Sequence, residues 1–494
     1  MRLFTTPTSD EWFFLGIIFF LVVVLITTAE IVRRLLNGGT EFTRKFVHVI
    51  VGILMVCAPY LFTSGVPVMM ISVMMVAVTF FSIRFDFLKS LHATGRTSYG
   101  TMYHPLAFLI LVILFWDSSP TILSISILIL AVPDALAAMA GQYVRSPHYL
   151  KVGDDKKTAE GTVTMFVSTL VCIILSTSFF GIETGMPILT VAIMISLFAA
   201  GWELISFKGS DNLTVPLGTA FMLHYFFTAS PYHIPEQMVT AVILASVVGI
   251  ASYYFKFLSL GGSIGTFLLA TVMYGVGGWE WTGPIFTFFV FSSLLSKYGK
   301  SRKKKFEMMF DKSDKRDAGQ VAANGGIAGI IILLWYAFPD NSILYSLYLA
   351  TVAAVTADTW GTEIGTLMKG NPRSIVTLRQ VEPGTSGGVS VAGLAGGAAG
   401  ALLIAFSACI VKSGQFSLKN IATIVVAGVV GSLVDSLLGA TLQAQYQTAD
   451  GKRTERAIVN GRPAQLIYGY RWMTNDIVNW MCALSGAAVM YFLL

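Results

Sequence analysis

Residues 12–31 read WFFLGIIFFLVVVLITTAEI, a run with one acidic residue, Glu30, and no basic one. A helix of about 20 apolar residues is long enough to cross the hydrocarbon core of a bilayer. The run therefore predicts a membrane-spanning helix. It is too long for the apolar core of a cleavable signal and lacks a small-residue cleavage site behind it, so we expect it to be the first span.

The rest of the chain has the same apolar character. Of its 494 residues, 55% are hydrophobic and only 12% are charged, whereas a soluble domain carries about 25% charged residues. The mean hydropathy is +0.71. This composition excludes a soluble enzyme and predicts an all-α polytopic membrane protein.

Apolar runs between polar breaks mark sixteen expected spans along the chain. They lie at 12–32, 46–63, 66–83, 103–116, 121–143, 161–179, 186–205, 214–229, 236–256, 259–276, 281–297, 318–338, 342–368, 387–411, 420–444 and 477–494.

Basic residues give these spans a sidedness, because Lys and Arg stay on the cytoplasmic side of a membrane. Of the 33 basic residues, 30 fall in loops that follow odd-numbered spans. We therefore expect a protein of the cell (inner) membrane with both termini outside and its polar loops in the cytoplasm. The net charge of +6 then reflects topology and lipid headgroups, and it gives no reason to expect nucleic acid as a partner.

The second span opens with a cationic motif that contains Arg44, Lys45 and His48. Arg44 and His48 are one turn apart and share a helical face. Cationic groups at the cytoplasmic start of a helix suit a phosphate ligand. A topological anchor with a hydrogen-bonded histidine explains the pattern equally well, so spacing alone leaves both interpretations open.

Asp134 lies inside the fifth span, in the stretch AVPDALAAMAG at 131–141. An ionised carboxylate inside an apolar helix costs at least about 2.5 kcal/mol on insertion scales, so it tends to be functional. The small residues up to Gly141 would let a ligand or a neighbouring helix approach closely. Helix packing alone explains the small residues but not the acid.

The next loop reads KKTAEGT over residues 156–162. It combines the ammonium groups of Lys156 and Lys157, the Thr158 hydroxyl, the Glu160 carboxylate and a glycine whose backbone can approach a phosphate. This set fits a nucleoside triphosphate with its magnesium ion. Further polar residues on the same predicted side are Glu203, Asp211 and Asn212.

Together these motifs resemble the dolichol kinase and phytol kinase family over roughly residues 40–225. The family pattern is R-K-x-x-H, D-x-x-A-x-x-x-G before K-K-T-x-E-G, and E…D-N-L-x-x-P, and this chain contains each element. The resemblance implies that residues 1–235 form a domain that phosphorylates a membrane prenol, such as phytol or geranylgeraniol, with CTP or a related nucleotide.

Residues 236–494 resemble a second membrane family, which includes plant phytyl-phosphate kinase and many transmembrane proteins of unknown role. The matching stretches include QVAANG (320–325), ADTWGTEIG (357–365), GTSGG (384–388), DSLLG (435–439) and NDIVN (475–479). The resemblance implies that this half adds a second phosphate to a prenyl monophosphate, which would make the chain a bifunctional lipid kinase.

The two halves also correspond to each other by span number. Asp134 in the fifth span matches Asp358 in the fifth span of the second half, and Glu160-Gly-Thr matches Glu382-Pro-Gly-Thr. An even number of spans preserves orientation, so the order of these matches predicts an 8+8 parallel repeat.

Phosphoryl transfer needs magnesium across the phosphates, cations on their oxygens, and a carboxylate that holds metal or takes the acceptor proton. Acidic residues assigned to catalysis are Asp134, Glu160, Asp358, Glu363 and Asp435, and all but Glu363 are expected magnesium ligands. Expected nucleotide and phosphate ligands are Arg44, Lys45, His48, Gly141, Lys156, Lys157, Thr158, Arg373, Arg379, Gly384, Thr385, Ser386 and Gly387. Other polar site residues are Glu203, Asp211, Asn212, Gln320, Asn324, Asp476 and Asn479.

Two of these expectations concern positive charge in the second half. Arg373 is expected at the phosphate of a monophosphate acceptor, because that substrate is already anionic. The most charged segment, residues 297–317, is instead expected to be solvated or to contact anionic lipid. Its far end is the exception: Asp317, with residues 320–324, matches the second family and is a candidate to reach the active site.

Two other protein classes share some of these features. A transporter or flippase of isoprenoid lipids also has parallel repeats and intramembrane acids, and a cytidylyltransferase that makes an activated lipid would use similar nucleotide ligands. A transport path needs polar residues through the full membrane depth, whereas here the acids recur with loop clusters on one predicted side. The sequence therefore favours the enzyme over the transporter.

Overall fold

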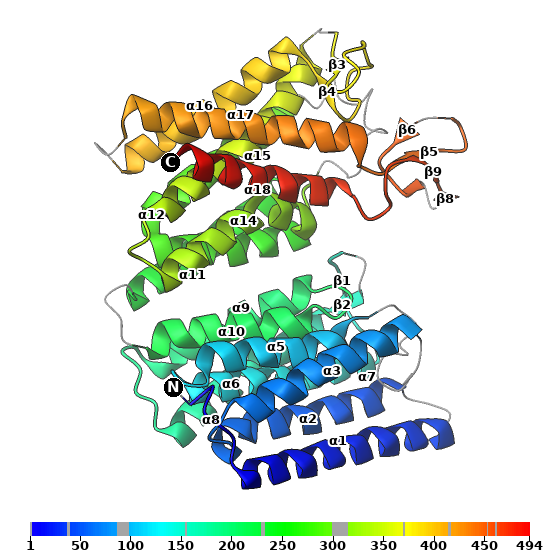
Figure 1. The fold of residues 1–494 in the computed structure, drawn as a ribbon, viewed down its shortest axis with the longest axis vertical. Coiled ribbons are helices and arrows are strands. Elements are labelled where there is room, and N and C mark those ends of the chain that lie inside the picture. Colours follow the sequence, from blue (N-terminus) through cyan, green and yellow to red (C-terminus); the bar gives the residue numbers. More distant parts are fainter. Residues whose placement is uncertain are drawn as a thin grey trace. The chain divides into compact units, whose positions relative to one another are not determined.

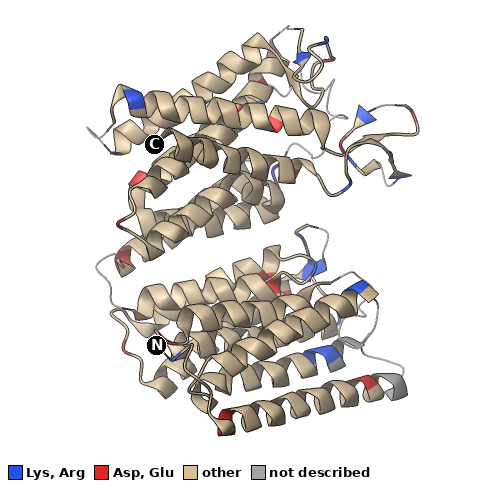
Figure 2. Ribbon diagram, viewed as in Figure 1, with Lys and Arg blue, Asp and Glu red and all other residues tan. Residues whose placement is uncertain are grey.

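The structure, a computed structural model, describes residues 2–36, 40–85, 98–153, 156–228, 233–298, 315–368, 371–412, 416–451, 453–459 and 462–494. The chain divides into two compact units, Met1–Pro235 and Glu236–Leu494 (Figure 1). Charged residues of each unit gather at helix ends and in the connecting loops (Figure 2).

The first unit is helical apart from one short hairpin. Its elements are α1 (Ser9–Leu36), α2 (Thr40–Leu61), α3 (Val66–Phe85), α5 (Gly100–Phe115), α6 (Pro120–Ala131), α7 (Pro133–Tyr143), β1 (Tyr149–Lys151), β2 (Lys156–Thr158), α8 (Ala159–Phe180), α9 (Ile188–Ile205) and α10 (Asp211–Phe227).

The second unit is built in the same way, with short antiparallel hairpins between its later helices. Its helices are α11 (Pro235–Tyr254), α12 (Leu260–Tyr298), α14 (Ala318–Ala337), α15 (Ile343–Leu367), α16 (Val391–Val411), α17 (Leu418–Thr441) and α18 (Asn475–Leu493). Its strands are β3 (Arg373–Ser374), β4 (Gly388–Val389), β5 (Gln445–Gln447), β6 (Arg453–Thr454), β7 (Ile458–Val459), β8 (Arg462–Pro463) and β9 (Gln465–Tyr468).

Thirteen helical segments in the described parts of the chain are long and apolar enough to cross a membrane. Helices α5 and α10 are slightly shorter, and α12 has two arms that meet at the non-helical Gly278 (φ 58°, ψ −152°). If α6 and α7 are counted as one span and the two arms of α12 as two, the helical segments coincide in sequence with the sixteen predicted spans. The prediction of an all-α polytopic membrane protein is confirmed.

The helix of the fifth span breaks where its acid lies. Pro133 starts α7 because it has no amide hydrogen with which to continue the ladder of α6. Asp134 therefore lies in the first turn of α7, where the helix dipole favours a carboxylate. The span Pro120–Tyr143 is 72% buried, more than any other span of the first unit, and Ile343–Leu367, which carries Asp358, is 67% buried in the second.

The order of helix packing recurs in the two units. In the first, α2 packs on α6, α3 on α5, α7 on α8, α8 on α9 and α9 on α10. In the second, α12 packs on α15 and on α14, α15 on α16, α16 on α17 and α17 on α18. When the helices are matched by span number, these pairs correspond, which supports the predicted repeat of eight spans. The second unit differs in that α15 also packs on α17.

The predicted sidedness can be tested with two exposed aspartates. Asp340 lies in the turn between α14 and α15, on the predicted outside, and Asp450 lies between β5 and β6, on the predicted cytoplasmic side. In a chain whose four native cysteines are replaced, we expect Asp340→Cys to react with a membrane-impermeant maleimide in intact cells. Asp450→Cys should react only after permeabilisation, and the reverse pattern would contradict the sidedness.

Candidate active site

A buried ion pair joins α2 to α7 in the first unit. Asp134 is 3% exposed, and its Oδ2 lies 2.5 Å from Lys45 Nζ. His48 Nε2 lies 3.7 Å from the same oxygen and hydrogen-bonds the Leu130 carbonyl at 3.1 Å, while its ring packs on His104. Lys45 and His48 of the predicted cationic motif therefore face the buried carboxylate.

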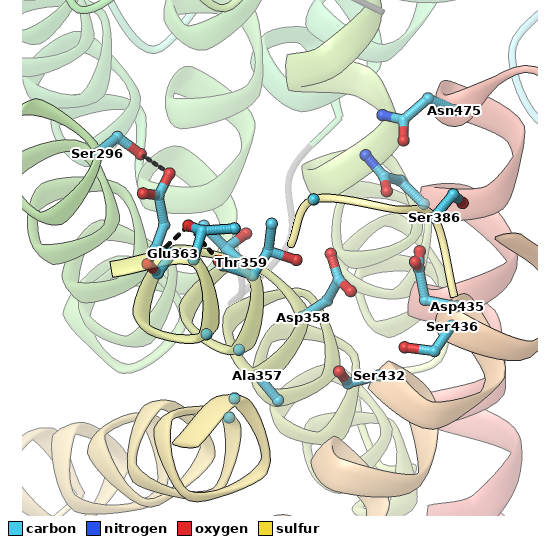
Figure 3. Close-up of a pocket in the computed structure, with 18 of the residues that line it drawn as sticks. Ser296, Ala357, Asp358, Thr359, Glu363, Ser386, Ser432, Asp435, Ser436 and Asn475 are labelled. Atoms are coloured by element: carbon cyan, nitrogen blue, oxygen red, sulfur yellow. Dashed lines mark hydrogen bonds between the residues drawn. The ribbon is translucent and has the colours of Figure 1, made fainter. Parts of the chain in front are cut away.

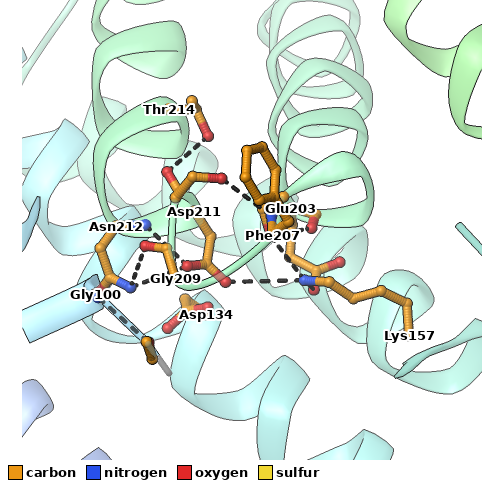
Figure 4. Close-up of polar contacts among 12 residues, drawn as sticks. Gly100, Asp134, Lys157, Glu203, Phe207, Gly209, Asp211, Asn212 and Thr214 are labelled. Carbon is orange, nitrogen blue, oxygen red and sulfur yellow. Dashed lines mark hydrogen bonds and ion pairs between the residues drawn. The ribbon is translucent and has the colours of Figure 1, made fainter. Parts of the chain in front are cut away.

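A second buried pair lies at the end of the β1–β2 hairpin (Figure 4). Lys157 Nζ donates to Glu203 Oε1 at 2.6 Å and to Ser206 Oγ at 2.9 Å, and it lies 3.8 Å from Asp211 Oδ2. Burial alone would lower the pKa of Lys157, but the two carboxylates raise it above its usual value. The fold thus brings two predicted site residues, Glu203 and Asp211, to the protonated amine of a third, Lys157.

Asn212 links this cluster to the start of α5. Its side-chain amide donates to the Gly209 carbonyl at 3.2 Å and to Asp211 Oδ1 at 2.9 Å (Figure 4). Gly209 has φ +84°, and a Cβ there would lie 2.5 Å from the backbone nitrogen of Gly100. Glycine at this turn therefore allows the loop after α9 to reach α5.

Glu160 and Lys156 lie apart from these clusters. Glu160 Oε1 lies 2.6 Å from His148 Nδ1, because the first turn of α8 brings this carboxylate against the hairpin. Lys156 is exposed and lies 5.9 Å from the ring centroid of Tyr149. Glu160, which we expected to share magnesium or base work with Asp134, therefore contacts His148, whereas Glu203 is close enough to Asp134 for their charges to interact.

Two predicted nucleotide ligands have packing roles between α7 and α8. The Thr158 hydroxyl caps α8 by accepting from the Gly161 amide at 3.1 Å. A Cβ on Gly141 would lie 2.6 Å from Thr158 Oγ1, and one on Gly161 would lie 3.0 Å from the Ala137 carbonyl oxygen. Gly141 therefore faces Thr158 rather than an open ligand site.

An apolar cavity of about 130 Å³ lies between α1, α2, α3 and α5. Its wall includes Val22, Met55 and Phe108. Five polar residues of its lining come from the starts of α2, α5 and α10, and Ser72 and Thr79 of α3 also line it. The five are Arg44, His48, Thr101, His104 and Asn212. An elongated apolar ligand bound there would place a polar head beside the buried ion pair of α2 and α7.

The second unit contains a larger, polar cavity of about 880 Å³ (Figure 3). The predicted site residues that line it are Gln320, Asn324, Asp358, Glu363, Gly384, Thr385, Ser386, Gly387, Asp435 and Asn479. Cations that we did not assign from the sequence also line it: Lys256, Lys297, Lys315, Arg316 and Arg456. These cations come from three separate connections between elements and from the last turn of α12, so no local motif links them.

Two carboxyl groups meet in this polar cavity. Asp358 on α15 and Asp435 on α17 both line it, and they lie close enough for their charges to interact (Figure 3). Asp435 Oδ2 is buried and has no hydrogen-bond partner among the described residues. Adjacent carboxylates repel unless a proton or a cation lies between them, so this pair fits Mg²⁺, which takes one or two carboxylates plus water and phosphate oxygens. No group of three His, Cys, Asp or Glu side chains suited to a metal occurs in the part of the chain that the structure describes.

The other predicted groups of this cavity are held by defined contacts. Glu363 is 6% exposed, and its Oε1 accepts from Ser296 Oγ at 2.6 Å (Figure 3). In the loop before α16, Ser386 Oγ donates to Gln443 Oε1 at 2.9 Å. Gly387 has φ +76°, which fits the glycine predicted at this loop.

Three predicted site residues do not line the cavity: Arg373, Arg379 and Asp476. Arg373 is exposed, and its Nη1 donates to the Leu378 carbonyl at 3.3 Å. The pairing of β3 with β4 holds Arg373 opposite Val389, which lines the cavity, but Arg373 itself is not part of the lining. The expectation that Arg373 meets the acceptor phosphate is therefore corrected, since the cavity takes its positive charge from other residues.

The glycine contacts around Thr158 recur in the second unit. Ser390 caps α16 by accepting from the Gly393 amide at 3.0 Å. A Cβ on Gly365 would lie 3.3 Å from Ser390 Oγ, and one on Gly393 would lie 3.0 Å from the Gly361 carbonyl oxygen.

These recurring contacts align Thr158 with Ser390, and this alignment changes how the two halves correspond in sequence. The buried aspartate and the serine or threonine cap are 24 residues apart in the first unit and 32 apart in the second. The predicted match of Glu160 with Glu382 is wrong, because the connection in the second unit is longer and Glu382 lies before its helix cap rather than after it. The match of Asp134 with Asp358 agrees with the recurring contacts.

Comparison with known proteins gives a match to one family model and to several individual proteins. Residues 243–487 match the family model described as integral membrane protein DUF92. Protein PGR of Arabidopsis thaliana is 30% identical over 273 residues, which are 50% of this chain and 93% of that protein. A phytol kinase of Synechocystis sp. is 34% identical over 213 residues, which are 43% of this chain and 90% of that protein. An uncharacterized membrane protein of Methanocaldococcus jannaschii is 28% identical over 207 residues, which are 42% and 84% of the two chains. No solved structure matches the chain.

Removal of the buried amine tests the first cluster. We expect Lys157→Met to lower the free energy of unfolding by about 3 kcal/mol, because it leaves buried carboxylates without their counter-ion. The folded-state pKa of Lys157 is raised, so its contribution is complete below the unfolded-state pKa and is lost only as pH rises through the folded-state value. The loss should therefore be equal at pH 7 and pH 9 when unfolding is followed in detergent.

Lys156→Met is the matched control, since Lys156 is adjacent in sequence but exposed. We expect it to change the free energy of unfolding by less than about 0.5 kcal/mol. Equal destabilisation by the two variants would contradict the buried pair.

Proposed function

We propose that this chain, which belongs to the DUF92 family of integral membrane proteins, is a membrane kinase that phosphorylates an isoprenoid alcohol and then the resulting monophosphate. The observation that carries the proposal is the apolar cavity of the first unit, whose polar lining lies beside Asp134. Such a site suits a ligand with a long hydrocarbon tail and one small polar head. The similarity to a phytol kinase supports the same class of acceptor.

The first unit acts on the alcohol. The hydroxyl oxygen forms a bond to the γ-phosphorus of the nucleotide, and the bond from that phosphorus to the bridging oxygen of the diphosphate breaks. The hydroxyl proton passes to Asp134, the buried carboxylate nearest the polar end of the cavity. Arg44 and Lys157 neutralise the phosphates.

The second unit acts on the monophosphate in its polar cavity. Its acceptor is anionic, and five cations line that cavity. Asp358 and Asp435 are the residues that would hold magnesium there. When bound, magnesium would supply positive charge that neutralises the charge developing on the nucleotide phosphates. We propose CTP as the nucleotide in the first unit because of the motif resemblance.

Charges at the opposite ends of the helices argue against a transport path. Glu11 Oε1 accepts from the Thr63 and Ser64 amides at 2.6 and 2.9 Å, so this acid holds the α2–α3 connection. In the second unit, Lys412 Nζ pairs with Glu280 Oε2 at 3.2 Å. Glu11 and Glu280 thus stabilise local structure at these ends of the helices. The cavities with several polar groups lie at the other end.

Two aspartate variants test the division of labour. We expect Asp134→Asn to slow phosphorylation of geranylgeraniol by about 10²–10⁴-fold, the usual range for loss of a general base. The same variant should phosphorylate geranylgeranyl monophosphate within twofold of the wild-type rate. Asp358→Asn should convert the alcohol at the wild-type rate and accumulate the monophosphate.

The products are separated by chromatography after incubation of purified chain with nucleotide and each acceptor in turn. Asp450→Asn, an exposed aspartate in the β5–β6 connection, is the control expected to leave both steps unchanged. Equal loss of both steps in Asp134→Asn and in Asp358→Asn would show that the two units do not act separately.

A further inference from the structure

The second unit has an apolar groove that the proposed chemistry does not yet use. It has a volume of about 230 Å³ and lies between α11, α12 and α14. Its wall includes Ala245, Ala270 and Phe288. The groove is therefore suited to a hydrocarbon chain rather than to a nucleotide.

Three polar residues line both this groove and the polar cavity of about 880 Å³: Arg316, Gln320 and Asn324. Gln320 and Asn324 are one turn apart on α14, so they share a helical face. The apolar groove and the polar cavity consequently meet along the start of α14. A ligand that places its tail in the groove must pass its head between these three side chains.

Arg316 is the charged group at this junction. Its guanidinium carbon lies 5.8 Å from the ring centroid of Phe288, which belongs to the groove wall. Its backbone is fixed, because Ser259 donates to the Arg316 carbonyl at 3.0 Å and Asp317 caps α14. No carboxylate among the described residues forms an ion pair with it. Burial lowers the pKa of Arg316 below its usual value, and the charge of Glu363 offsets only part of this effect. An anion bound at the junction would supply a direct counter-charge.

A comparable arrangement occurs in the first unit. The apolar cavity there lies between the first four spans, α1, α2, α3 and α5, and it includes Arg44 in its lining. The groove of the second unit lies between α11, the two arms of α12, and α14, which are the first four spans of that unit. The two cavities therefore occupy the same place in the order of helices.

We propose that the groove between α11, α12 and α14 holds the hydrocarbon tail of an isoprenyl monophosphate and that Arg316 binds its phosphate. This inference rests on the proposed function of the second unit and adds the site at which that unit holds its acceptor. The planar guanidinium can donate two parallel hydrogen bonds to one phosphate. An alcohol in the same groove would leave this charge uncompensated, so the junction selects the phosphorylated acceptor.

The kinetics of the second step test Arg316. With geranylgeranyl monophosphate as the acceptor, we expect Arg316→Gln to raise KM at least tenfold and Arg316→Lys to raise it by less. Phosphorylation of geranylgeraniol by the first unit, measured on the same preparation, should stay within twofold of wild type and shows that the variant is folded. Lys419→Gln, which removes an exposed cation at the start of α17, should leave KM unchanged.

Acceptors of two lengths test the groove. Ala270→Phe fills it and should raise KM for the 20-carbon monophosphate at least tenfold, while KM for dimethylallyl monophosphate, with five carbons, changes less than twofold. Ala395→Phe adds the same bulk at an exposed position on α16 and should have no effect.

Failure of the site and failure of the proposed function give different results. If wild-type chain phosphorylates the monophosphate and neither Arg316→Gln nor Ala270→Phe changes KM, the site is overturned and the proposed function stands. If wild-type chain neither binds nor phosphorylates the monophosphate, the proposed second step is overturned together with its site.

Discussion

An ion pair between Lys45 and Asp134, buried among apolar helices, fixes where α2 meets α7. Either charge alone in those surroundings would cost several kcal/mol, so the pair must form wherever this unit is folded. The helix break at Pro133 helps to form this pair, because it places Asp134 in the first turn of a new helix. The pair also fixes the positions of the groups around it, including His48 and the start of α5.

The second unit meets the same constraint in a different way. Asp358 and Asp435 face each other, and no lysine or arginine among the described residues forms an ion pair with them. Their charge must be balanced by a proton or by a cation that arrives with the ligand. The first unit thus carries its own counter-ion and suits a neutral acceptor, whereas the second has a cation-lined cavity and suits an anionic acceptor with its metal-bound nucleotide.

Much of the fold could be predicted from the sequence, because hydrophobic runs and the placement of Lys and Arg report directly on spans and their boundaries. Asp134, Asp358 and Asp435 were also identifiable, since a carboxylate in an apolar run is costly. The contacts of Lys157 and the position of Arg373 were not, because they depend on how two short hairpins fold back. Arg316 was missed for a related reason: it lies in a charged connection, and only packing places it between a groove and a cavity.

The most direct test of the central claim is the fate of label from CTP carrying ³²P at the α- or the γ-phosphate, with geranylgeraniol and the wild-type chain. If the first unit transfers the terminal phosphoryl group of CTP, γ-label appears in the lipid monophosphate, which the second unit then converts to the diphosphate, and α-label stays in the water-soluble nucleotide. Transfer of α-label to the lipid would identify a cytidylyltransferase, and the absence of label from the lipid in both incubations would contradict a kinase.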